Sequence, residues 1–309
     1  MASPLRLTIA TAALPVDVAD IVADAAWTIV QGTFEVAEAA MSRFREGSEL
    51  TWLNRRSPAA ASISRPLERA LSAADRARRI SSGRFDPRIV EALERIGYAG
   101  ASQGPAAALR PLPGDGRIID RDGRSGRVAL PCPVDLGGIG KGLALRWAAN
   151  ALDASVVGAA VPPIGYLIDA GGDIVASGSP GAGEPWSIGI EDPGGGAEPV
   201  AVVGIGGRGA VATSSVRRLR WEHAGRTVHH LIDPGTGAPG GDGLLAVTVA
   251  GPDPAWAEVW SKALFLEGAG GIAALARSRG LAAWWLTTEG VLEMTPGARV
   301  RTVWVAGEA

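Results

Sequence analysis

The chain has 309 residues, of which 47% are hydrophobic, enough for one large domain or two small ones. Its charge is nearly balanced, with 30 basic against 32 acidic side chains, which argues against a nucleic-acid-binding protein and gives no electrostatic reason to lie on an anionic membrane. Cys132 is the only cysteine, so an internal disulfide is excluded.

The N-terminal residues lack the pattern of a secretory signal. One arginine is followed by a short mixed run, then by a proline and three aspartates. No window offers about 18 uninterrupted apolar residues, so no membrane-spanning helix is predicted. We therefore expect a cytoplasmic protein without a membrane anchor in this chain.

The first part of the chain is predicted to be mainly helical. Residues 17–45 and 66–80 carry apolar positions at helical spacing. In the segment 85–100, Asp86 can cap a helix, Pro87 fits the first turn and Gly97 can end it. Residues 101–127 are rich in Ala, Gly, Pro and Arg without periodicity, and we expect them to form a mobile excursion.

After residue 127 the pattern changes to short β-rich runs separated by Gly and Pro, which is typical of strands joined by tight turns. The runs are YLIDA, DIVASG, WSIGIED, AVVGI, LLAVTVAG, AAWWLTT and RTVWVAG. Two helices are predicted near 139–152 and 254–267, the second capped by Asp253 and starting at Pro254. Because the alternation is too irregular for a doubly wound parallel sheet, we predict an α+β fold, a single mixed domain of short β-strands and several helices over residues 1–309.

Four loops that combine glycine with charged residues are candidates for a site. The first leads from a strand end through Gly137 and Gly138 into a helix with Lys141 in its first turn. Glycines let a ligand approach the backbone, a helix start offers free N–H groups and a lysine adds positive charge, which together suit a phosphate. The spacing is neither that of a Walker loop nor that of a dinucleotide-binding fingerprint. An ordinary strand–helix turn with an exposed Lys141 explains the loop equally well.

The other three loops also have ordinary structural explanations. The second, Gly171-Gly172-Asp173, fits a type I′ hairpin between two strands. The third, residues 81–87, can be a helix exit, a turn and the next helix cap. In the fourth, HHLIDPGTG at 229–237, the last five residues explain a turn but not the two histidines. Because adjacent residues of an extended strand point to opposite sides, one of His229 and His230 could face a site while the other faces packing or water.

Taken in order, these loops and their neighbours resemble the ApbE family, the FAD:protein FMN transferases. The resemblance is carried by MSRFREGSELTWLN at 41–54, GRFDP at 83–87, DLGGIGKG at 135–142, GGDI at 171–174, WSIGIEDP at 186–193, ATSS at 212–215 and HLIDPGTGAP at 230–239. It spans residues 38 to 268, and the ordered set is far more specific than any single motif.

The resemblance implies an ApbE-like fold and a transfer reaction. FAD is bound with Mg²⁺ on its pyrophosphate, a Thr or Ser hydroxyl of an acceptor protein attacks the FMN-side phosphorus, and AMP leaves. Some members of the family instead hydrolyse FAD to FMN and AMP. The implied contacts to the flavin nucleotide are Met41, Arg84, Phe85, Asp86, Asp135, Lys141, Asp173 and Ile232.

The family's functional histidine falls at His230, which we expect to help deprotonate the incoming hydroxyl because imidazole can accept a proton near neutral pH. His229 would then be a supporting neighbour and His223 an exposed bystander. Arg84 stands where the family has a small residue, and its charge could lie beside the phosphates or its side chain could crowd the flavin ring.

The chain departs from the family pattern in the helix that supplies metal ligands. The resemblance implies a site made by the backbone carbonyl of Gly138 and two side chains of this helix, where Glu258 replaces an Asp and Lys262 replaces a Thr. A protonated lysine cannot bind Mg²⁺, which requires oxygen ligands.

Three interpretations of this helix stay open. Glu258 and Lys262 could form a surface ion pair one helical turn apart. Lys262 could instead take the place of the ion, neutralise the pyrophosphate and act in catalysis beside His230. The metal site could also be modified. A protein that only binds FAD is the alternative from a different functional class.

Overall fold

The computed structural model of the chain describes residues 4–11, 14–98, 112, 116–123, 125–159, 164–217 and 219–307. In this part of the chain the helices are α1 Val16–Met41, α2 Glu49–Arg56, α3 Arg65–Ile80, α4 Val90–Arg95, α5 Gly140–Asp153, α6 Val156–Ala159, α7 Pro254–Glu267, α8 Ala269–Ser278 and α9 Pro296–Arg299. The strands are β1 Leu5–Ile9, β2 Asp120–Arg121, β3 Val128–Ala129, β4 Tyr166–Ala170, β5 Asp173–Ser177, β6 Trp186–Ile190, β7 Ala201–Ile205, β8 Gly209–Ser215, β9 Arg220–His223, β10 Arg226–His229, β11 Ile232–Asp233, β12 Ala238–Pro239, β13 Leu244–Gly251, β14 Ala282–Thr287, β15 Leu292–Met294 and β16 Thr302–Val305.

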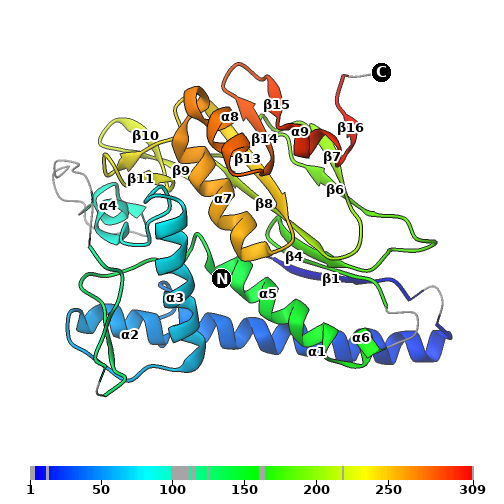
Figure 1. Ribbon diagram of the computed structural model, residues 1–309, viewed down its shortest axis with the longest axis horizontal. Coiled ribbons are helices and arrows are strands. Elements are labelled where there is room, and N and C mark those ends of the chain that lie inside the picture. The colour runs from blue at the N-terminus through cyan, green and yellow to red at the C-terminus, as the bar shows by residue number, and fades with distance from the viewer. Residues whose placement is uncertain are drawn as a thin grey trace.

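An antiparallel sheet with the strand order β1-β4-β5-β8-β13-β14-β15 forms the centre of the molecule (Figure 1). It is buried on both faces, as β14 shows. Ala283 and Trp285 of β14 pack toward α7 and α8, whereas Ala282 and Trp284 pack toward the small sheet β16-β7-β6. Because side chains alternate along a strand, one short apolar run fills two cores.

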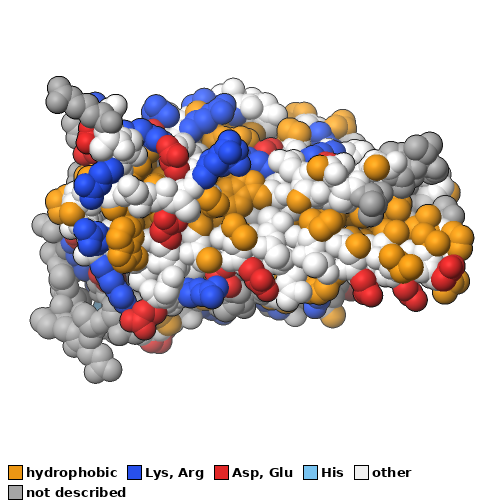
Figure 2. Space-filling view, turned by 90° about the horizontal axis from the view of Figure 1, so that it is seen from below, with side chains coloured by type: hydrophobic (Ala, Val, Ile, Leu, Met, Phe, Trp, Pro, Cys, Tyr) orange, Lys and Arg blue, Asp and Glu red, His pale blue; other side chains and the backbone are white. Residues whose placement is uncertain are grey.

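The helices α5 and α7 cover one face of the central sheet, and α1 packs outside α5 (Figure 1). This arrangement places the first turn of α5 and the middle of α7 against the start of β5. The outer side of α1 carries exposed apolar residues, among them Val16, Ile21 and Val36. Hydrophobic side chains are spread over this face of the molecule (Figure 2). None of the helices among the described residues is both long and apolar enough to cross a bilayer.

The predicted α+β class is confirmed, and so are the main elements of the second half. The helices predicted near 139–152 and 254–267 are α5 and α7, and each predicted β-rich run contains a strand. The helix predicted over 17–45 is α1, which ends at Met41, and the helix predicted over 66–80 is α3. The strand β1, which pairs with β4 at the edge of the sheet, was not predicted.

The helix predicted between the cap Asp86 and Gly97 is present, but it begins later than predicted. Only Val90–Arg95 is helical, and Ile89 precedes it as the cap. Asp86 does not cap this helix because its carboxylate accepts the backbone N–H of Arg88 at 3.0 Å and ion pairs with two arginine side chains. The segment 86–89 therefore turns before the helix begins. Of the predicted excursion at 101–127, residues 101–111, 113–115 and 124 lie outside the described residues, and residues 120–121 form β2, which pairs with β3 directly after the segment.

Candidate functional site

Lys141 lies between two buried carboxylates from distant parts of the chain. Its Nζ is 2.8 Å from Oδ2 of Asp173 and 2.7 Å from Oε1 of Glu258. The other oxygen of Asp173 accepts the N–H of Thr213 at 3.1 Å, and the other oxygen of Glu258 accepts that of Gly142 at 2.8 Å. Burial acts to lower the pKa of Lys141, but the two carboxylates outweigh it and raise this pKa. The ammonium therefore stays charged, and the simple explanation of the loop with an exposed Lys141 is wrong.

The first turn of α5 reaches these carboxylates because α7 approaches it closely. A β-carbon on Gly142 would lie 2.5 Å from backbone atoms at the start of α7, so a glycine is needed at this crossing. α7 begins here because the Asp253 side chain accepts the N–H of Ala255 and Pro254 occupies the first turn. The predicted cap and first residue of this helix are confirmed.

Asp173 is the first residue of β5 and follows a two-residue turn. Gly171 and Gly172 have φ angles of 70° and 97°, which a type I′ hairpin requires of its two central residues. The predicted hairpin is therefore present, and it also brings the Asp173 carboxylate to Lys141. The structural and the functional interpretation of this loop are both compatible with the geometry.

Lys262 lies one turn after Glu258 on α7, and its ammonium fills the space beside Gly138. A β-carbon on Gly138 would collide with Nζ of Lys262 and lie 3.0 Å from the ring of Phe85. Burial lowers the pKa of Lys262, while the nearby carboxylates of Glu258 and Asp135 oppose this shift. Glu258 is only 4% exposed and is bound to Lys141. The interpretation of Glu258 and Lys262 as a surface ion pair is therefore wrong.

The two adjacent histidines point to different surroundings, as predicted for neighbours in an extended segment. Nδ1 of His229 accepts the N–H of Leu231 at 3.3 Å, and its ring meets Phe265 edge-on. His230 instead lies over the ring of Tyr98. Burial, followed by the positive charge of Lys262, lowers the pKa of His230 to about 3. His230 is therefore neutral at physiological pH and lies within electrostatic reach of the Lys262 ammonium.

His223 is not an exposed bystander. Its ring packs against Gly97, and its Nε2 is buried without a hydrogen-bond partner in the part of the chain that the structure describes.

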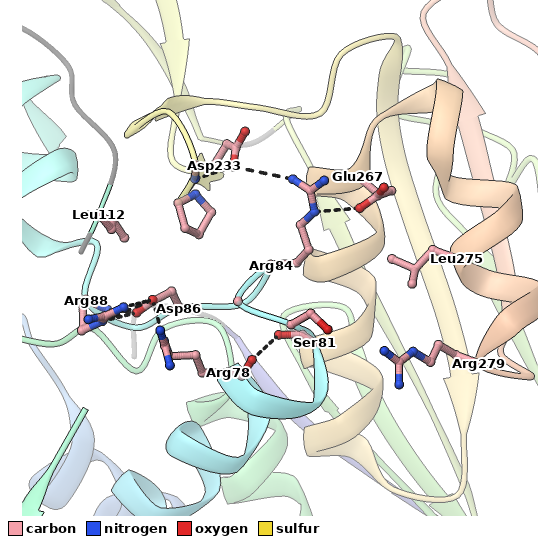
Figure 3. Close-up of a pocket in the computed structure, with 14 residues that line it drawn as sticks. Arg78, Ser81, Arg84, Asp86, Arg88, Leu112, Asp233, Glu267, Leu275 and Arg279 are labelled. Carbon is pink, nitrogen blue, oxygen red and sulfur yellow. Dashed lines mark hydrogen bonds and ion pairs between the residues drawn. The ribbon is translucent and has the colours of Figure 1, made fainter. Parts of the chain in front are cut away.

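The loop 81–88 separates the lysines from a cavity of about 580 Å³. Its walls are this loop, Leu112, the turn 233–235 and parts of α7 and α8 (Figure 3). Side chains alternate along the loop, so that Arg84 and Asp86 line the cavity while Phe85 reaches Gly138. The volume falls in the range of roughly 300–1,000 Å³ that is usual for small-molecule sites.

Arg84 is held by two carboxylates that line the same cavity. Its Nε lies 2.7 Å from Glu267, and its guanidinium lies 3.8 Å from Asp233 (Figure 3). The two ion pairs of Arg84 therefore connect the turn at 233 to the end of α7.

The remaining candidates lie in two places. Met41 is buried at the end of α1 in the same apolar cluster as Phe85. Asp135 ion pairs with Arg43 at 2.8 Å and accepts the N–H of Gly137, which fixes the glycine turn. Ile232 is buried apart from them, against residues of α4.

An aromatic group that was not predicted from the sequence lies beside His230. Tyr98 stacks on Trp221 with ring centroids 5.3 Å apart and meets Phe44 edge-on at 5.9 Å. Arg43 lies over the Tyr98 ring at 5.5 Å. Burial, followed by the charge of Asp135, raises the pKa of Tyr98. No local pattern joins these residues, because they come from four separate segments.

The small number of lysines in the sequence also indicates this site. The chain contains only two lysines, Lys141 and Lys262, against 28 arginines. Both lysines lie at the junction of α5 and α7.

The metal site that the resemblance implies, at Gly138 and the helix with Glu258, does not fit a divalent cation here. Within the described residues, no group of three or more His, Cys, Asp or Glu side chains is placed to bind a metal ion. Both oxygens of Glu258 already have hydrogen-bond partners, and the space beside Gly138 is filled by the Lys262 ammonium. A cation there would meet positive charge instead of an oxygen ligand.

Comparison with known sequences gives relatives of one kind. The FAD:protein FMN transferase of Escherichia coli (strain K12) is 34% identical over 158 residues, which are 51% of this chain and 43% of that protein. The FAD:protein FMN transferase of Haemophilus influenzae is 27% identical over 259 residues, which are 77% of this chain and 71% of that protein. The match therefore spans less than half the length of the Escherichia coli relative.

Solved structures show the same fold. An ApbE protein from Thermotoga maritima superposes with a TM-score of 0.81 at 22% identity, covering 97% of this chain and 96% of that one. The apo flavinyl transferase ApbE of Pseudomonas stutzeri gives a TM-score of 0.73 at 25% identity, covering 90% and 88%. The family model described as the ApbE family matches residues 1–285, and the chain therefore belongs to the ApbE family.

Proposed function

We propose that this chain is an FAD:protein FMN transferase, which moves FMN from FAD to a Thr or Ser hydroxyl of an acceptor protein and releases AMP. The observation that carries this proposal is the convergence of the segments 135–142, 171–174 and 230–239 with α7. They bring Lys141, Lys262 and His230 into one charged site. Relatives that bear this activity in their name belong to the same family.

In this reaction the acceptor hydroxyl oxygen bonds to the FMN phosphorus. The bond between that phosphorus and the oxygen that bridges to the AMP phosphate breaks, and AMP leaves with this oxygen. The hydroxyl proton must go to a base, and we assign that role to His230. Its Nδ1 lies 3.4 Å from the carbonyl of Leu219, which can only accept a hydrogen bond. A proton on Nδ1 leaves Nε2 free to accept one from the acceptor.

The charge of Lys262 links substrate binding to this base. In the protein alone, burial and the Lys262 ammonium keep the pKa of His230 low. A phosphate beside Lys262 would offset that positive charge and raise the pKa of His230, since a nearby like charge is one of the causes that lower it. His230 would then be a better base when the substrate is bound than when it is absent.

Binding roles are proposed for the residues that line the two sides of the loop 81–88. Phe85, which reaches Gly138, and Met41 of the same apolar cluster would supply apolar contacts, and the cavity lined by Arg84 and Asp86 has room for part of the dinucleotide. Asp135 would orient the glycine turn, while Asp173 holds Lys141 in place. Ile232 supports the segment that carries His230. Glu258 is not assigned as a magnesium ligand, because its two oxygens already bind Lys141 and the N–H of Gly142.

The test is to incubate the protein with FAD and an acceptor domain that carries a motif of the form D-x-x-[ST]-[GA]-A-T. We expect the acceptor to gain the mass of one FMN while one equivalent of AMP is released. His230→Ala should reduce transfer strongly and leave FAD affinity mostly intact, while His229→Ala is the matched control and should lose less. Release of FMN and AMP without an acceptor at the same rate would identify a hydrolase. Tight FAD binding without any turnover would identify a binding protein.

A further inference from the structure

We propose that the Lys262 ammonium takes the place of the divalent cation in this site, so that the chain binds the FAD diphosphate without a metal ion. This inference rests on the proposed function for the identity of the ligand. It concerns how the ligand's charge is neutralised, which can be measured by binding alone.

The two lysines of the site differ in what surrounds their charge. Lys141 is bound by Asp173 and Glu258 at ion-pair distance, so its charge is satisfied within the protein. For Lys262 no carboxylate lies at ion-pair distance among the described residues, and its Nζ fills the space beside Gly138. A half-buried ammonium without a bound counter-ion is available to bind an anion from solution.

The backbone at Gly138 also favours the binding of an anion. The glycine turn leads directly into the first turn of α5, where a helix start favours negative charge. Because residue 138 has no side chain, Lys262 and Phe85 both reach the turn. An anion bound there would contact the ammonium itself. A divalent cation would be repelled by the same charge.

The choice of lysine at this position supports the proposal independently. The chain uses arginine 28 times and lysine twice, so a basic residue here is normally an arginine. A guanidinium is planar and wide, whereas an ammonium is a compact point charge. Only the compact group suits the narrow space between Gly138 and Phe85, which is the space that a small cation would need.

The first experiment measures FAD affinity of the full chain by flavin fluorescence, once with EDTA and once with Mg²⁺. The native protein should bind FAD equally well in both. Since a hydrogen bond to a charged group is worth roughly 1.5–3 kcal/mol, Lys262→Met should weaken FAD binding about ten- to a hundredfold. Riboflavin, which has no phosphate, should be affected much less. Arg277→Met, which removes one exposed charge from the neighbouring helix α8, is the matched control and should bind FAD normally.

The second experiment uses the scarcity of lysine. An amine-acylating reagent followed by peptide mass spectrometry can modify only Lys141, Lys262 and the chain's amino terminus. We expect FAD to protect Lys262 in the presence of EDTA and Mg²⁺ alone to leave its labelling unchanged. Labelling of the chain's amino terminus serves as the internal reference.

Three results would overturn the proposal: FAD affinity that rises tenfold or more with Mg²⁺, protection of Lys262 by Mg²⁺ alone, or no protection of Lys262 by FAD. An equal loss of FAD and riboflavin binding in Lys262→Met would also count against it. A failure of the proposed function is distinguishable, because a protein that binds FAD through Lys262 but modifies no acceptor satisfies every binding result.

Discussion

Two groups of charged residues lie on either side of Phe85, and they differ in how completely their charges are paired. On the cavity side, Asp86 is 6% exposed and binds the buried guanidinium of Arg88 at 2.6 Å and that of Arg78 at 3.1 Å. All of these are arginine contacts with planar, directed hydrogen bonds. These ion pairs stabilise the loop that carries Phe85.

On the other side, the group around Lys141 contains two ammonium groups and two carboxylates, but both carboxylates bind Lys141. Asp173 and Glu258 satisfy Lys141, and Lys262 remains without a bound carboxylate among the described residues. A purely structural cluster would not retain such a charge, since burying it costs free energy. In this chain the candidate site is therefore marked by an ammonium that lies without a directly bound carboxylate among the described residues.

The comparison predicts first that Asp86 stabilises the fold more than any residue around it. Asp86→Ala would leave the buried Arg88 guanidinium without its carboxylate. Breaking a buried pair in this way costs about 3–5 kcal/mol. Urea unfolding followed by tryptophan fluorescence measures the free energy of unfolding. A decrease in the free energy of unfolding of less than about 1 kcal/mol would show that water replaces the carboxylate and that these ion pairs do not stabilise the loop.

The second prediction concerns the two lysines. Lys141→Met would leave the buried carboxylates of Asp173 and Glu258 without a cation, and should destabilise the fold by up to about 3–5 kcal/mol. Lys262→Met removes a charge that has no bound carboxylate within the described part of the chain, so it should cost less than about 1 kcal/mol or even stabilise the fold. The same unfolding measurement checks both variants. Equal losses would mean that Lys262 is as much a structural residue as Lys141.

The helices and strands that were predicted correctly are those marked by residues close to them in the sequence. α7 was predicted correctly because Asp253 and Pro254 mark its start, and the β4–β5 hairpin because two glycines supply the positive φ angles. The predicted start of the helix after Asp86 was wrong because the Asp86 carboxylate is bound by Arg88 and by Arg78 of another helix. β1 was missed for a similar reason, since an edge strand gains its structure from pairing with β4, far along the chain.

The site shows the same division between local and distant signals. Ordered motifs identified the segments that carry Lys141, Asp173 and His230. The surroundings of Glu258 could not be predicted, because helical periodicity assigns polar residues to solvent. α7 is buried nearly all round between α5, α8 and the sheet, so its polar side faces another helix instead of water. Only the fold reveals that Glu258 binds Lys141 and not Lys262.

The third prediction follows from the pKa of His230. It is about 3 in the folded protein, below the value of about 6.5 in an unfolded chain. As the pH falls from about 6.5 toward 3, the unfolded state binds a proton that the folded state does not, so stability is lost, by at most about 1.4 kcal/mol for each pH unit. The decline in unfolding free energy between pH 7 and pH 5 should be shallower in His230→Asn. Identical slopes in the two proteins would mean that His230 is solvated and titrates normally.

The smallest expected effect is that of Arg84, which links Asp233 and Glu267 in the wall of the cavity. Its side chain is 38% exposed, so its ion pairs with Glu267 and Asp233 are screened by water and should be worth no more than about 1 kcal/mol together. Arg84→Ala should therefore hardly change the free energy of unfolding. It should instead release the turn at 233–235, which hydrogen exchange of the Gly235 and Gly237 amides can detect, since both donate to Asp233. Unchanged exchange would show that the Asp233 turn holds its shape by itself, and that the arginine at this position serves the cavity or its ligand and not the fold.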